Sequence, residues 1–455
     1  MFDKPVKQDG LYFLPLGGTG EIGMNLNLYL HNNHMIMVDC GSMFQDPDGV
    51  LHPRLDEFIV PDTHFVEENR GALQAIILTH AHEDHIGAIL ALWHRFPTRI
   101  YATPFTAEVL RRKVARSRDD RHNDILAQIV VVETNHWYQV GPFDIQWKPL
   151  THSTLESNGL LIRTPVHSVF HTGDWKFDAN PVIGPATPTP SEFALDDVCI
   201  DSVICDSTNA LKPGHSVSEQ VVMQGIRKTV APLTGRVFVS CFASNVARLL
   251  SIAHVAKQTG RYLAVLGRAF ENMISIARAL DYWPKQLKIY SAAEVAYLPK
   301  EEVMYLVTGS QGEPRAALNM LTKGSFRGVD MEEGDSVIFS SMRIPGNEVE
   351  IARLIANIKA RKVSVIENDM VEQDIHASGH PCRDELRHLY RHIKPKIMVA
   401  THGTAEHLYQ HSLIAKECGV RRTLVGLNGD LFQLHPVSKR FEGYASTARV
   451  LLPSP

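Results

Sequence analysis

The chain has 455 residues, 44% hydrophobic and 21% charged, which is ordinary for a globular protein and enough for two or three domains. No run of about 18 apolar residues occurs, which excludes a membrane-spanning helix, and a formal net charge of −4 excludes a general attraction to nucleic acid, so that any polyanion must be bound locally. The polar amino terminus and six cysteines without paired metal spacing predict a cytoplasmic protein with reduced thiols.

The first 208 residues are dense in short apolar segments separated by turns. Strands are predicted at 11–18, 27–41, 73–80, 98–103, 129–134, 143–150, 159–165, 167–174 and 201–208. Apolar residues at helical spacing follow one of these strands at 86–96. This density of strands with interleaved helices favours a sandwich of sheets flanked by helices. The proline-rich piece at 181–193 is expected to be a surface loop.

The pattern changes after Gly214. Helices near 216–231, 244–258 and 269–282 alternate with strands such as RVFVSCF, RYLAVLG and MYLVTGSQG. This alternation is typical of βαβ units with a parallel sheet. From about residue 363 isolated strands return (KVSVIEN, KIMVATHG and RRTLVGLNG), each leading toward a histidine or a turn. The chain as a whole is therefore predicted to have an α/β fold.

The most informative segment is His-Ala-His-Glu-Asp-His at residues 80–85, which places three imidazoles and the carboxylate of an aspartate within six positions. It follows a β-branched apolar strand that ends at Thr79 and precedes a helical pattern. The cluster is therefore expected on a strand-to-helix turn, where neighbouring side chains converge. Neutral imidazole and carboxylate suit zinc or manganese with open positions for water. The segment predicts a metal site.

Further acids and histidines stand at the ends of predicted strands. They are Asp39, His152, Asp174, Asp206 and His402. A single histidine at a strand end is usually structural. The recurrence of this pattern beside the 80–85 segment instead favours a set of ligands that is large enough for two metal ions.

Several motifs, taken in chain order, resemble known families. THAHEDH with a later His, Asp and His resembles the metallo-β-lactamase fold, and GGTGEIGMN, CDSTNA, CFASN, LGRAF, TGSQGEP, PGNE, HASGH and THG resemble ribonuclease J of the β-CASP nuclease branch. The resemblance runs from about residue 11 to about residue 435. It implies an αββα sandwich built from residues 1–209 and 368–455, with a β-CASP domain inserted at 210–367. The insert would close over the metal face and leave a channel for single-stranded RNA.

By this resemblance two divalent metal ions are expected, with zinc the first choice and manganese or magnesium as alternatives. The implied ligands are His80, His82 and His152 for the first ion, Asp84, His85 and His402 for the second, and Asp174 as a bridge between them. Asp39 would orient a ligand from behind. Two cations about 3.5–4 Å apart activate a shared water and neutralise charge on the phosphoryl oxygens.

The resemblance also implies catalytic residues. Asp206, His380 and His402 coincide with the three sequence motifs that distinguish the branch. Asp84, Asp206 and His380 are the expected catalytic residues. His380 would bind the phosphate or donate a proton to the departing 3′ oxygen.

Candidate contacts to RNA or to a 5′-terminal phosphate are Ser244, Asn245, Arg268, His376, Ser378, Gly379 and Phe44. CFASN and LGRAF each follow a predicted strand and open a predicted helix, where backbone N–H groups favour anions. Arg268 suits a two-pronged contact to phosphate. The alternatives are ordinary helix caps with a surface arginine, a loop-supporting His376, and a Phe44 that packs in the core instead of stacking on a base.

The expected function is a metal-dependent ribonuclease that degrades single-stranded RNA from 5′-monophosphate ends in the 5′-to-3′ direction and also cleaves internally. A DNA nuclease or a small-molecule phosphodiesterase is the alternative, because water and not the 2′-OH is the nucleophile. A non-catalytic RNA-processing subunit is disfavoured because none of the implied ligands is missing. The resemblance implies a homodimer, although the chain, ending at residue 455, is expected to lack the C-terminal domain that helps to pair subunits in many relatives.

Overall fold

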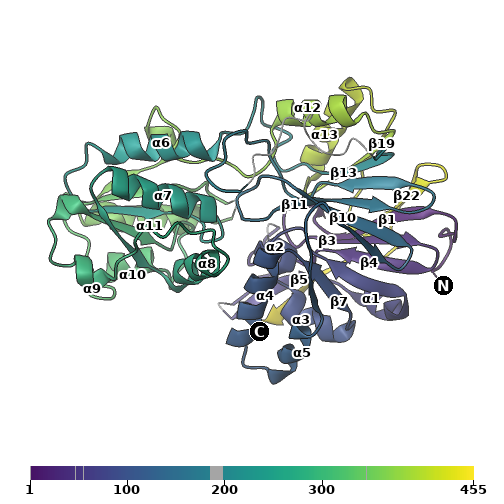
Figure 1. Cartoon of the computed structure of the whole chain (residues 1–455), viewed down its shortest axis with the longest axis horizontal. Coiled ribbons are helices and arrows are strands. Elements are labelled where there is room, and N and C mark those ends of the chain that lie inside the picture. Colours follow the sequence, from purple (N-terminus) through teal and green to yellow (C-terminus); the bar gives the residue numbers. More distant parts are fainter. Residues whose placement is uncertain (1, 47, 55, 185–197, 345, 455) are drawn as a thin grey trace.

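The computed structural model describes residues 2–46, 48–54, 56–184, 198–344 and 346–454. Figure 1 shows a sandwich of sheets with flanking helices and, beside it, a smaller lobe formed by the middle of the chain. This arrangement confirms the expected α/β sandwich with an insertion. Most of the predicted proline-rich surface loop, residues 185–193, lies outside the described residues. Among the described residues, no helix is both long and apolar enough to cross a membrane.

The first sheet of the sandwich contains the amino-terminal strands. In hydrogen-bonded order it consists of β23 (Lys439–Phe441), β22 (Leu431–His435), β1 (Leu11–Gly17), β3 (Leu26–His31), β4 (His34–Val38), β6 (Leu73–Ile77), β7 (Arg99–Ala102) and β8 (Ile129–Val131). The prediction of one strand over 27–41 is wrong, because this segment forms the antiparallel hairpin β3–β4. Asn32 and Asn33 between the strands both have positive φ, at 49° and 60°, which is the conformation of a two-residue hairpin turn.

The second sheet packs against the first. Its order is β21 (Arg422–Leu424), β19 (Ile397–Thr401), β13 (Ser202–Asp206), β12 (Ser168–His171), β11 (Asn158–Arg163), β10 (Phe143–Pro149) and β9 (Trp137–Val140). Fully buried side chains from both sheets, such as Phe13, Ile36, Trp147 and Ile204, form the core between them. The indole N–H of Trp147 also donates to the carbonyl of Leu78 over 2.9 Å, which ties the second sheet to the segment that leads into the histidine motif.

Helices cover the outer faces of the sandwich (Figure 1). They are α1 (His64–Glu68), α2 (Glu83–Ile86), α3 (Ile89–Leu92), α4 (Pro104–Arg116) and α5 (Asn123–Leu126) beside the first sheet, and α12 (Arg383–Ile393) and α13 (Ala405–Glu417) beside the second. The helix predicted at 86–96 is wrong in its bounds, because α2 begins within the histidine motif and a break separates it from α3. Gly87 lies at this break, where a Cβ atom would come within 2.1 Å of the Ser42 hydroxyl. Short pairings β2 (Thr19–Gly20) with β20 (Gly403–Thr404) and β5 (Glu57–Pro61) with β24 (Arg449–Pro453) complete the sandwich.

The inserted lobe is built on a parallel sheet, as the alternating pattern predicts. Its strands are β15 (Tyr262–Leu266), β16 (Val303–Val307), β14 (Val237–Ser240), β17 (Ser336–Phe339) and β18 (Ser364–Ile366), in that order. Its helices are α6 (Glu219–Val230), α7 (Val246–Gln258), α8 (Arg268–Ala279), α9 (Ala292–Val295), α10 (Ala317–Lys323) and α11 (Glu348–Ala360). The segments CFASN and LGRAF follow the carboxyl ends of β14 and β15, as expected.

The sandwich positions the candidate ligands through the direction of its strands. β4 runs parallel to β6, and β12, β13 and β19 are parallel to one another. β10 has the direction of β12, because both are antiparallel to β11. The residues at or after the carboxyl ends of these strands are Asp39, the 80–85 segment, His152, Asp174, Asp206 and His402. Side chains far apart in the sequence therefore meet at one edge of the sandwich.

One buried carboxylate connects the two crossings between the lobes. Glu385 in α12 is 1% exposed. It accepts hydrogen bonds from the backbone and hydroxyl of Ser216, on the way into the insert, at 2.8 and 2.7 Å. It also accepts from the backbone of Cys382, on the way back, at 2.8 Å, and from the backbone of Phe177 at 2.9 Å. Glu385 thus links the entry and exit of the inserted lobe, in addition to backbone hydrogen bonds such as that from Arg383 to Lys212.

We expect Glu385→Ala to lower the free energy of unfolding by about 3 kcal/mol, because each hydrogen bond to a charged group contributes about 1.5–3 kcal/mol and the variant leaves buried donors without an acceptor. Urea unfolding followed by circular dichroism measures this loss. Glu417→Ala is the control: this carboxylate is 57% exposed in its contact with Arg387, and the expected loss is below about 1 kcal/mol. Equal losses in both variants would contradict the role of Glu385.

Candidate metal centre

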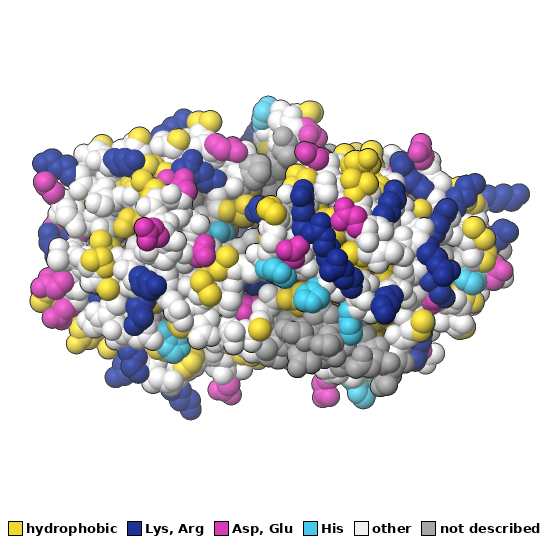
Figure 2. All heavy atoms as spheres, turned by 90° about the horizontal axis from the view of Figure 1, so that it is seen from above, with side chains coloured by type: hydrophobic (Ala, Val, Ile, Leu, Met, Phe, Trp, Pro, Cys, Tyr) yellow, Lys and Arg dark blue, Asp and Glu magenta, His cyan; other side chains and the backbone are white. Residues whose placement is uncertain are grey.

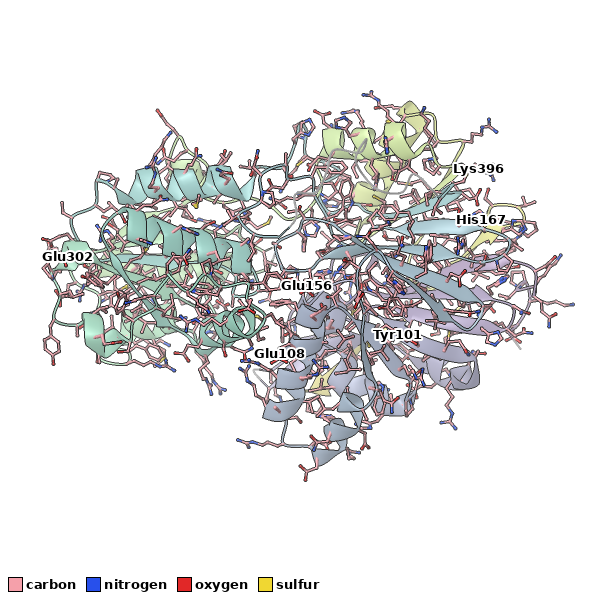
Figure 3. All side chains as sticks on the ribbon, viewed as in Figure 1. Tyr101, Glu108, Glu156, His167, Glu302 and Lys396 are labelled. Atoms are coloured by element: carbon pink, nitrogen blue, oxygen red, sulfur yellow. The ribbon has the colours of Figure 1, made fainter. Side chains whose placement is uncertain are left out.

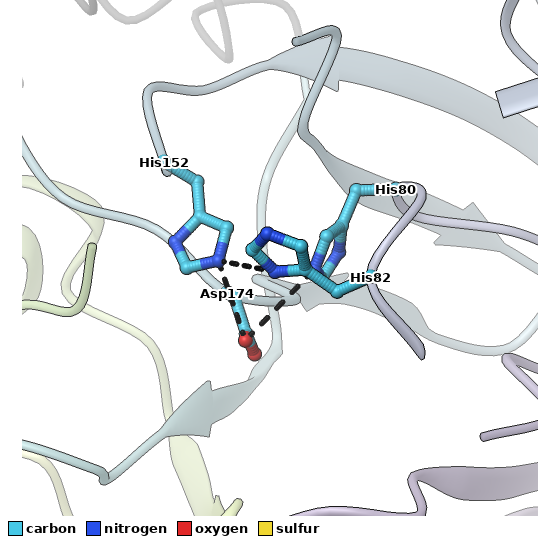
Figure 4. A group of neighbouring side chains, drawn as sticks. All are labelled: His80, His82, His152 and Asp174. Carbon is cyan, nitrogen blue, oxygen red and sulfur yellow. Dashed lines mark hydrogen bonds and ion pairs between the residues drawn. The ribbon is translucent and has the colours of Figure 1, made fainter. Parts of the chain in front are cut away.

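The first cluster joins the histidine motif to the ends of two strands in the second sheet (Figure 4). His82 Nδ1 lies 3.1 Å from His80 Nε2 and 3.0 Å from His152 Nε2. Asp174 Oδ2 lies 3.7 Å from His152 Nε2 and 4.0 Å from His80 Nε2. One donor atom from each of these residues falls within 4.8 Å of all the others, which is the spacing of ligands around one metal ion.

The second cluster shares Asp174 with the first. Asp84, His85, Asp174 and His402 also offer ligand atoms within 4.8 Å of one another. His85 Nε2 lies 3.6 Å from Asp84 Oδ2 and 3.3 Å from Asp174 Oδ2. His402 lies 3.5 Å from Asp84 through Nε2 and 2.9 Å from Asp174 Oδ1 through Nδ1. The carboxylate of Asp174 therefore stands between two ligand groups.

Asp39 and Thr79 orient two of these imidazoles through contacts to their Nδ1 atoms. Asp39 Oδ2 lies 2.7 Å from His85 Nδ1. Both oxygens of Asp39 also accept from Thr79, at 2.9 Å from its backbone N–H and 2.8 Å from its hydroxyl. Because the Thr79 hydroxyl donates to Asp39, it accepts from His80 Nδ1, 3.0 Å away. Nε2 of His80 is then left with a lone pair that faces the cluster.

The HASGH segment supports His152 in the same way. His152 Nδ1 lies 2.6 Å from the carbonyl oxygen of Gly379. A carbonyl only accepts, so Nδ1 carries the hydrogen and Nε2 presents its lone pair. A side chain at position 379 is excluded, because a Cβ atom there would lie 2.5 Å from His152 Nδ1.

The donor set fits divalent cations. The Nε2 lone pairs of His80 and His152 face the same buried space, and each of these two nitrogens lies about 3 Å from Nδ1 of His82. This arrangement is unfavourable unless a cation accepts the lone pairs. His402 Nε2 is buried and has no hydrogen-bond partner among the described residues. Imidazole nitrogens with carboxylate oxygens, each oriented from behind, are the ligands that zinc takes in hydrolytic sites.

The electrostatics keep both ligand types in their binding forms in the first cluster. Burial, followed by the neighbouring imidazoles, lowers the pKa of His80 and His152 well below the usual range, and burial lowers the pKa of His82 to about 4. Burial alone would raise the pKa of Asp174, but His402 and His85 outweigh it and hold that pKa well below the usual range. Neutral imidazole and ionised carboxylate are the forms that bind metals.

The predicted catalytic pair lies against the second cluster. His380 Nδ1 is 2.7 Å from Asp206 Oδ2 and 3.9 Å from Asp174 Oδ2. Burial would lower the pKa of His380, but Asp206 and Asp174 raise it above its ordinary value. The other oxygen of Asp206 accepts from the backbone and hydroxyl of Thr208 at 2.8 and 2.7 Å, which fixes the carboxylate.

The backbone is strained at two site residues. Asp39 has φ of 63° and His402 has φ of 51°, a left-handed conformation that residues other than glycine adopt rarely. The backbone N–H of His402 donates to the carbonyl of Gly18 over 2.6 Å, so the GGTG turn fixes its position. Such strain persists only where surrounding contacts determine it, and it concentrates at functional sites.

The predicted phosphate-binding residues lie on the inserted lobe, and their side chains differ in availability. Asn245 caps α7, accepting from the backbone N–H of Arg248 at 2.9 Å, and its amide donates to Glu219 at 3.3 Å. Its side chain is thus committed within the lobe, and Ser244 precedes it on the same turn. Arg268 is exposed at the start of α8 and makes no hydrogen bond or ion pair within the described part of the chain.

Of the remaining RNA-contact candidates, Ser378 and Gly379 lie beside the metal centre. Ser378 accepts from the amide of Asn209 over 2.8 Å, and Gly379 uses its carbonyl on His152. His376 lies 3.5 Å from Arg248 and is largely buried. Phe44 is 60% exposed, so core packing is excluded for it.

Sequence reasoning missed supporting residues of ordinary type. The sequence pattern identifies Thr79 only as the end of a strand and does not distinguish Asn25 within GGTGEIGMN. The amide of Asn25 lies 3.0 Å from His85 Nε2 and donates to the carbonyl of Asp84 at 3.2 Å. Their positions next to recognised motifs were the available signal.

Three family descriptions match the chain in succession. "Beta-lactamase superfamily domain" covers residues 16–200, "Ribonuclease J, beta-CASP domain" covers 234–358, and "Zn-dependent metallo-hydrolase RNA specificity domain" covers 370–421. Ribonuclease J of Sinorhizobium meliloti is 38% identical over 94% of this chain and 75% of its own length. The chain belongs to the ribonuclease J family.

Other members of the family are similarly close. Ribonuclease J of Mycolicibacterium smegmatis is 34% identical over 91% of this chain and 73% of its own length, and that of Thermus thermophilus is 31% identical over 94% and 74%. A crystal structure of a protein of unknown function from Enterococcus faecalis shares the fold, with a TM-score of 0.65 at 15% identity over 93% of this chain and all of the other.

Family membership and geometry together define the class of activity. The chain is a metal-dependent ribonuclease with a metallo-β-lactamase fold and an inserted β-CASP domain. The clustered histidines and aspartates provide for binding of divalent metal, and RNA is the substrate class of the family.

We expect Asp39→Asn to weaken zinc binding about 10- to 100-fold, the range for residues that orient metal ligands. The amide places a donor where the carboxylate accepts from His85 and Thr79. Titration of the metal-free protein with zinc against a competing chelator measures the change. The control is Asp62→Asn, because among the described residues this carboxylate accepts only from the backbone of His64. Equal affinity in both variants would exclude the proposed orientation.

We expect Gly379→Ala to weaken metal binding by about tenfold or more, because the added methyl group must displace His152 or the HASGH backbone. Equilibrium dialysis followed by elemental analysis measures the retained metal. Gly71→Ala is the matched control, because a Cβ atom at position 71 meets nothing within 4 Å. Full metal retention in the Gly379 variant would contradict the role of this close approach.

Proposed function

We propose that this ribonuclease J family member degrades single-stranded RNA in the 5′-to-3′ direction from 5′-monophosphate ends, with internal cleavage as a second activity. The observation that carries the proposal is the HASGH segment. One end contacts the metal centre through Gly379 and His380, and the other end contacts α7 of the inserted lobe through His376 and Arg248. Four Cα–Cα steps of 3.80 Å keep these ends within about 15 Å.

The start of α7 supports a terminal phosphate site. Backbone N–H groups at a helix N-terminus attract anions, and this helix is 13 residues long. Because Asn245 caps the helix internally, we assign the phosphate contact to the backbone of this turn together with the hydroxyl of Ser244. Arg268 at the start of α8 would add a permanent charge and a two-pronged hydrogen bond.

His376 supports the same assignment. Burial, and next the charge of Arg248, lower the pKa of His376 to about 3, so its imidazole is neutral near pH 7. Arg248 lies 3.5 Å from Nδ1 of His376. Nε2 is buried and has no partner in the described part of the chain. We assign it as a contact to the terminal phosphate.

A cavity of about 340 Å³ lies between the lobes. His152 borders it on the side of the metal centre, and Ala247 in the first turn of α7 and Tyr282 border it on the side of the inserted lobe. We propose that the 5′-terminal nucleotide occupies this space. Phe44, exposed after the Asp39 turn, is assigned as a stacking surface for a base further along the strand.

The RNA backbone would be held locally. On the face shown in Figure 2, Lys and Arg side chains lie on both lobes and alternate with Asp and Glu. This mixture agrees with the net charge of −4. Binding therefore depends on the terminal phosphate, on base contacts and on the metal centre.

The residues of the chain have two proposed roles, which are to bind the metal ions and to donate a proton. Bound divalent cations, zinc most readily, would activate a water molecule and neutralise charge on the phosphoryl oxygens. His80, His82, His152 and Asp174 would hold one of two ions, and Asp84, His85, His402 and Asp174 the other. His380, oriented by Asp206, holds a proton beside the scissile position and would deliver it to the departing 3′ oxygen.

Three organisational assignments complete the proposal. The domain boundaries are residues 1–209, 210–367 and 368–455, the second being the insert. The active form is a homodimer, which light scattering after size-exclusion chromatography would test. The protein acts in the cytoplasm.

The polarity is tested with RNA labelled at either end and carrying a 5′-monophosphate, 5′-triphosphate or 5′-hydroxyl. We expect 5′-monophosphate RNA to release mononucleotides first from the 5′ end, and Asp84→Ala, or chelation of the metal, to abolish the release. A matched DNA strand tests sugar discrimination. Release of mononucleotides from the 3′ end, or equal rates for all 5′ ends, would contradict the proposed polarity or end preference.

Arg268→Ala tests the phosphate site. We expect kcat/KM to fall about 10- to 100-fold on 5′-monophosphate RNA, the equivalent of losing a charged hydrogen bond worth about 1.5–3 kcal/mol, and to change little on 5′-hydroxyl RNA. Arg353→Ala, which removes an exposed arginine paired within α11 to Glu350, is the control. A uniform loss on both RNAs would place Arg268 outside the phosphate site.

A further inference from the structure

The loop of residues 152–158 connects the metal centre to the junction between the lobes. It begins with His152, a proposed metal ligand. The hydroxyl of Ser157 donates to the backbone carbonyl of Asp174 over 3.1 Å. Figure 3 shows Glu156, near the end of this loop, between the sandwich and the inserted lobe.

A third contact reaches the histidine motif. The backbone N–H of Asn158 donates to the carbonyl of Thr79 over 3.2 Å, directly before His80. The short loop thus carries one ligand and hydrogen-bonds to the backbone at, or next to, two others. A displacement of the loop would move several parts of the metal centre together.

Glu156 uses its two oxygens on two different partners. Oε1 accepts from the hydroxyl of Tyr282, in the inserted lobe, over 2.7 Å. Oε2 accepts from the backbone N–H of Phe105, in the first turn of α4, over 2.7 Å, where a carboxylate is favoured by the helix dipole. The residue has φ of 50°, a left-handed conformation that is maintained only when surrounding contacts determine it.

The hydrogen bond between Glu156 and Tyr282 borders an open cavity and is not enclosed by packed side chains on all sides. The cavity of about 340 Å³ borders both Glu156 and Tyr282, so part of the junction beside their hydrogen bond is open. Burial, followed by the hydrogen bond to Glu156, raises the pKa of Tyr282 above its ordinary value, so its hydroxyl remains a donor. A second contact between the lobes, from Arg112 of α4 to the hydroxyl of Ser275 of α8 over 2.9 Å, does not involve the 152–158 loop.

We propose that Glu156 is a positioning residue that couples the inserted lobe to the metal centre. Its hydrogen bond to Tyr282 links it to the inserted lobe. Through the 152–158 loop it holds His152 and the backbone of Asp174 in their ligand positions. The proposal rests on the assignment of His152 and Asp174 as metal ligands, and it is independent of the polarity of RNA degradation.

Two single-oxygen deletions at the same junction test this coupling. Tyr282→Phe removes the hydroxyl that reaches Glu156, whereas Ser275→Ala removes the hydroxyl that reaches only Arg112. The metal-free proteins are titrated with cobalt(II), and binding is followed by the visible absorption of the bound ion. We expect about tenfold weaker cobalt binding in Tyr282→Phe, the lower end of the range for residues that support ligands, and wild-type binding in Ser275→Ala.

Steady-state kinetics on single-stranded RNA add a second readout. Tyr282→Phe should lower kcat about tenfold, because the metal centre is disturbed. Glu156→Gln serves as an independent variant. Its single carbonyl oxygen can replace only one of the two acceptors, so it should weaken cobalt binding in the same direction, and circular dichroism establishes that each variant is folded.

The outcomes separate the two levels of the proposal. Wild-type cobalt affinity in Tyr282→Phe and Glu156→Gln would overturn the coupling while leaving the metal ligands in place. Equal weakening in Tyr282→Phe and Ser275→Ala would overturn it too, because any loosening of the junction would then suffice. A wild-type protein that binds no cobalt would overturn the ligand assignment, and the coupling with it.

Discussion

The structure depends on one buried carboxylate that faces several imidazoles. Asp174 is 2% exposed, and nitrogens of His402, His85, His152 and His80 lie between 2.9 and 4.0 Å from its oxygens. Concentrating so many polar atoms away from water is unfavourable unless cations accept their lone pairs and charge. The parallel strands of the sandwich make the convergence geometrically simple, because each ligand follows the carboxyl end of a strand.

The clustering of these histidines and aspartates could be predicted because their chemistry is dense in the sequence, whereas their division between two ions rests on the family resemblance. Three imidazoles and an aspartate fall within residues 80–85, and the other acids and histidines end apolar strands. The hydrogen bonds that aim these side chains were less accessible. Thr79 and Asn25 are common residue types, and their roles follow from orientations that arise only after the sheets have packed.

The secondary structure was predictable where periodicity was clear and uncertain where turns decided it. The parallel lobe follows its alternating pattern closely. The single strand over 27–41 is instead a hairpin, because adjacent asparagines adopt positive φ at its centre. The phosphate-site residues show a related limit: a helix-capping side chain such as Asn245 has the same sequence pattern whether it binds a ligand or, as here, its own lobe.

The contacts that join the inserted lobe to the sandwich are made between residues far apart in the sequence. Tyr282 and Glu156 are 126 positions apart, and Glu385 lies 169 positions from Ser216. No local pattern identifies such pairs. Glu156 and Glu385 each accept hydrogen bonds from backbone and side-chain donors of separate segments, so hydrogen bonds beside the ligand loops contribute to the contact between the insert and the sandwich.

The most direct test of the central claim is an anomalous difference map from crystals of the zinc-loaded protein, recorded at the zinc edge. The account predicts two peaks about 3.5–4 Å apart, on either side of the Asp174 carboxylate. Their other neighbours should be His80, His82 and His152 for one peak and Asp84, His85 and His402 for the other. A single peak, or an Asp174 carboxylate turned away from the metal, would contradict it.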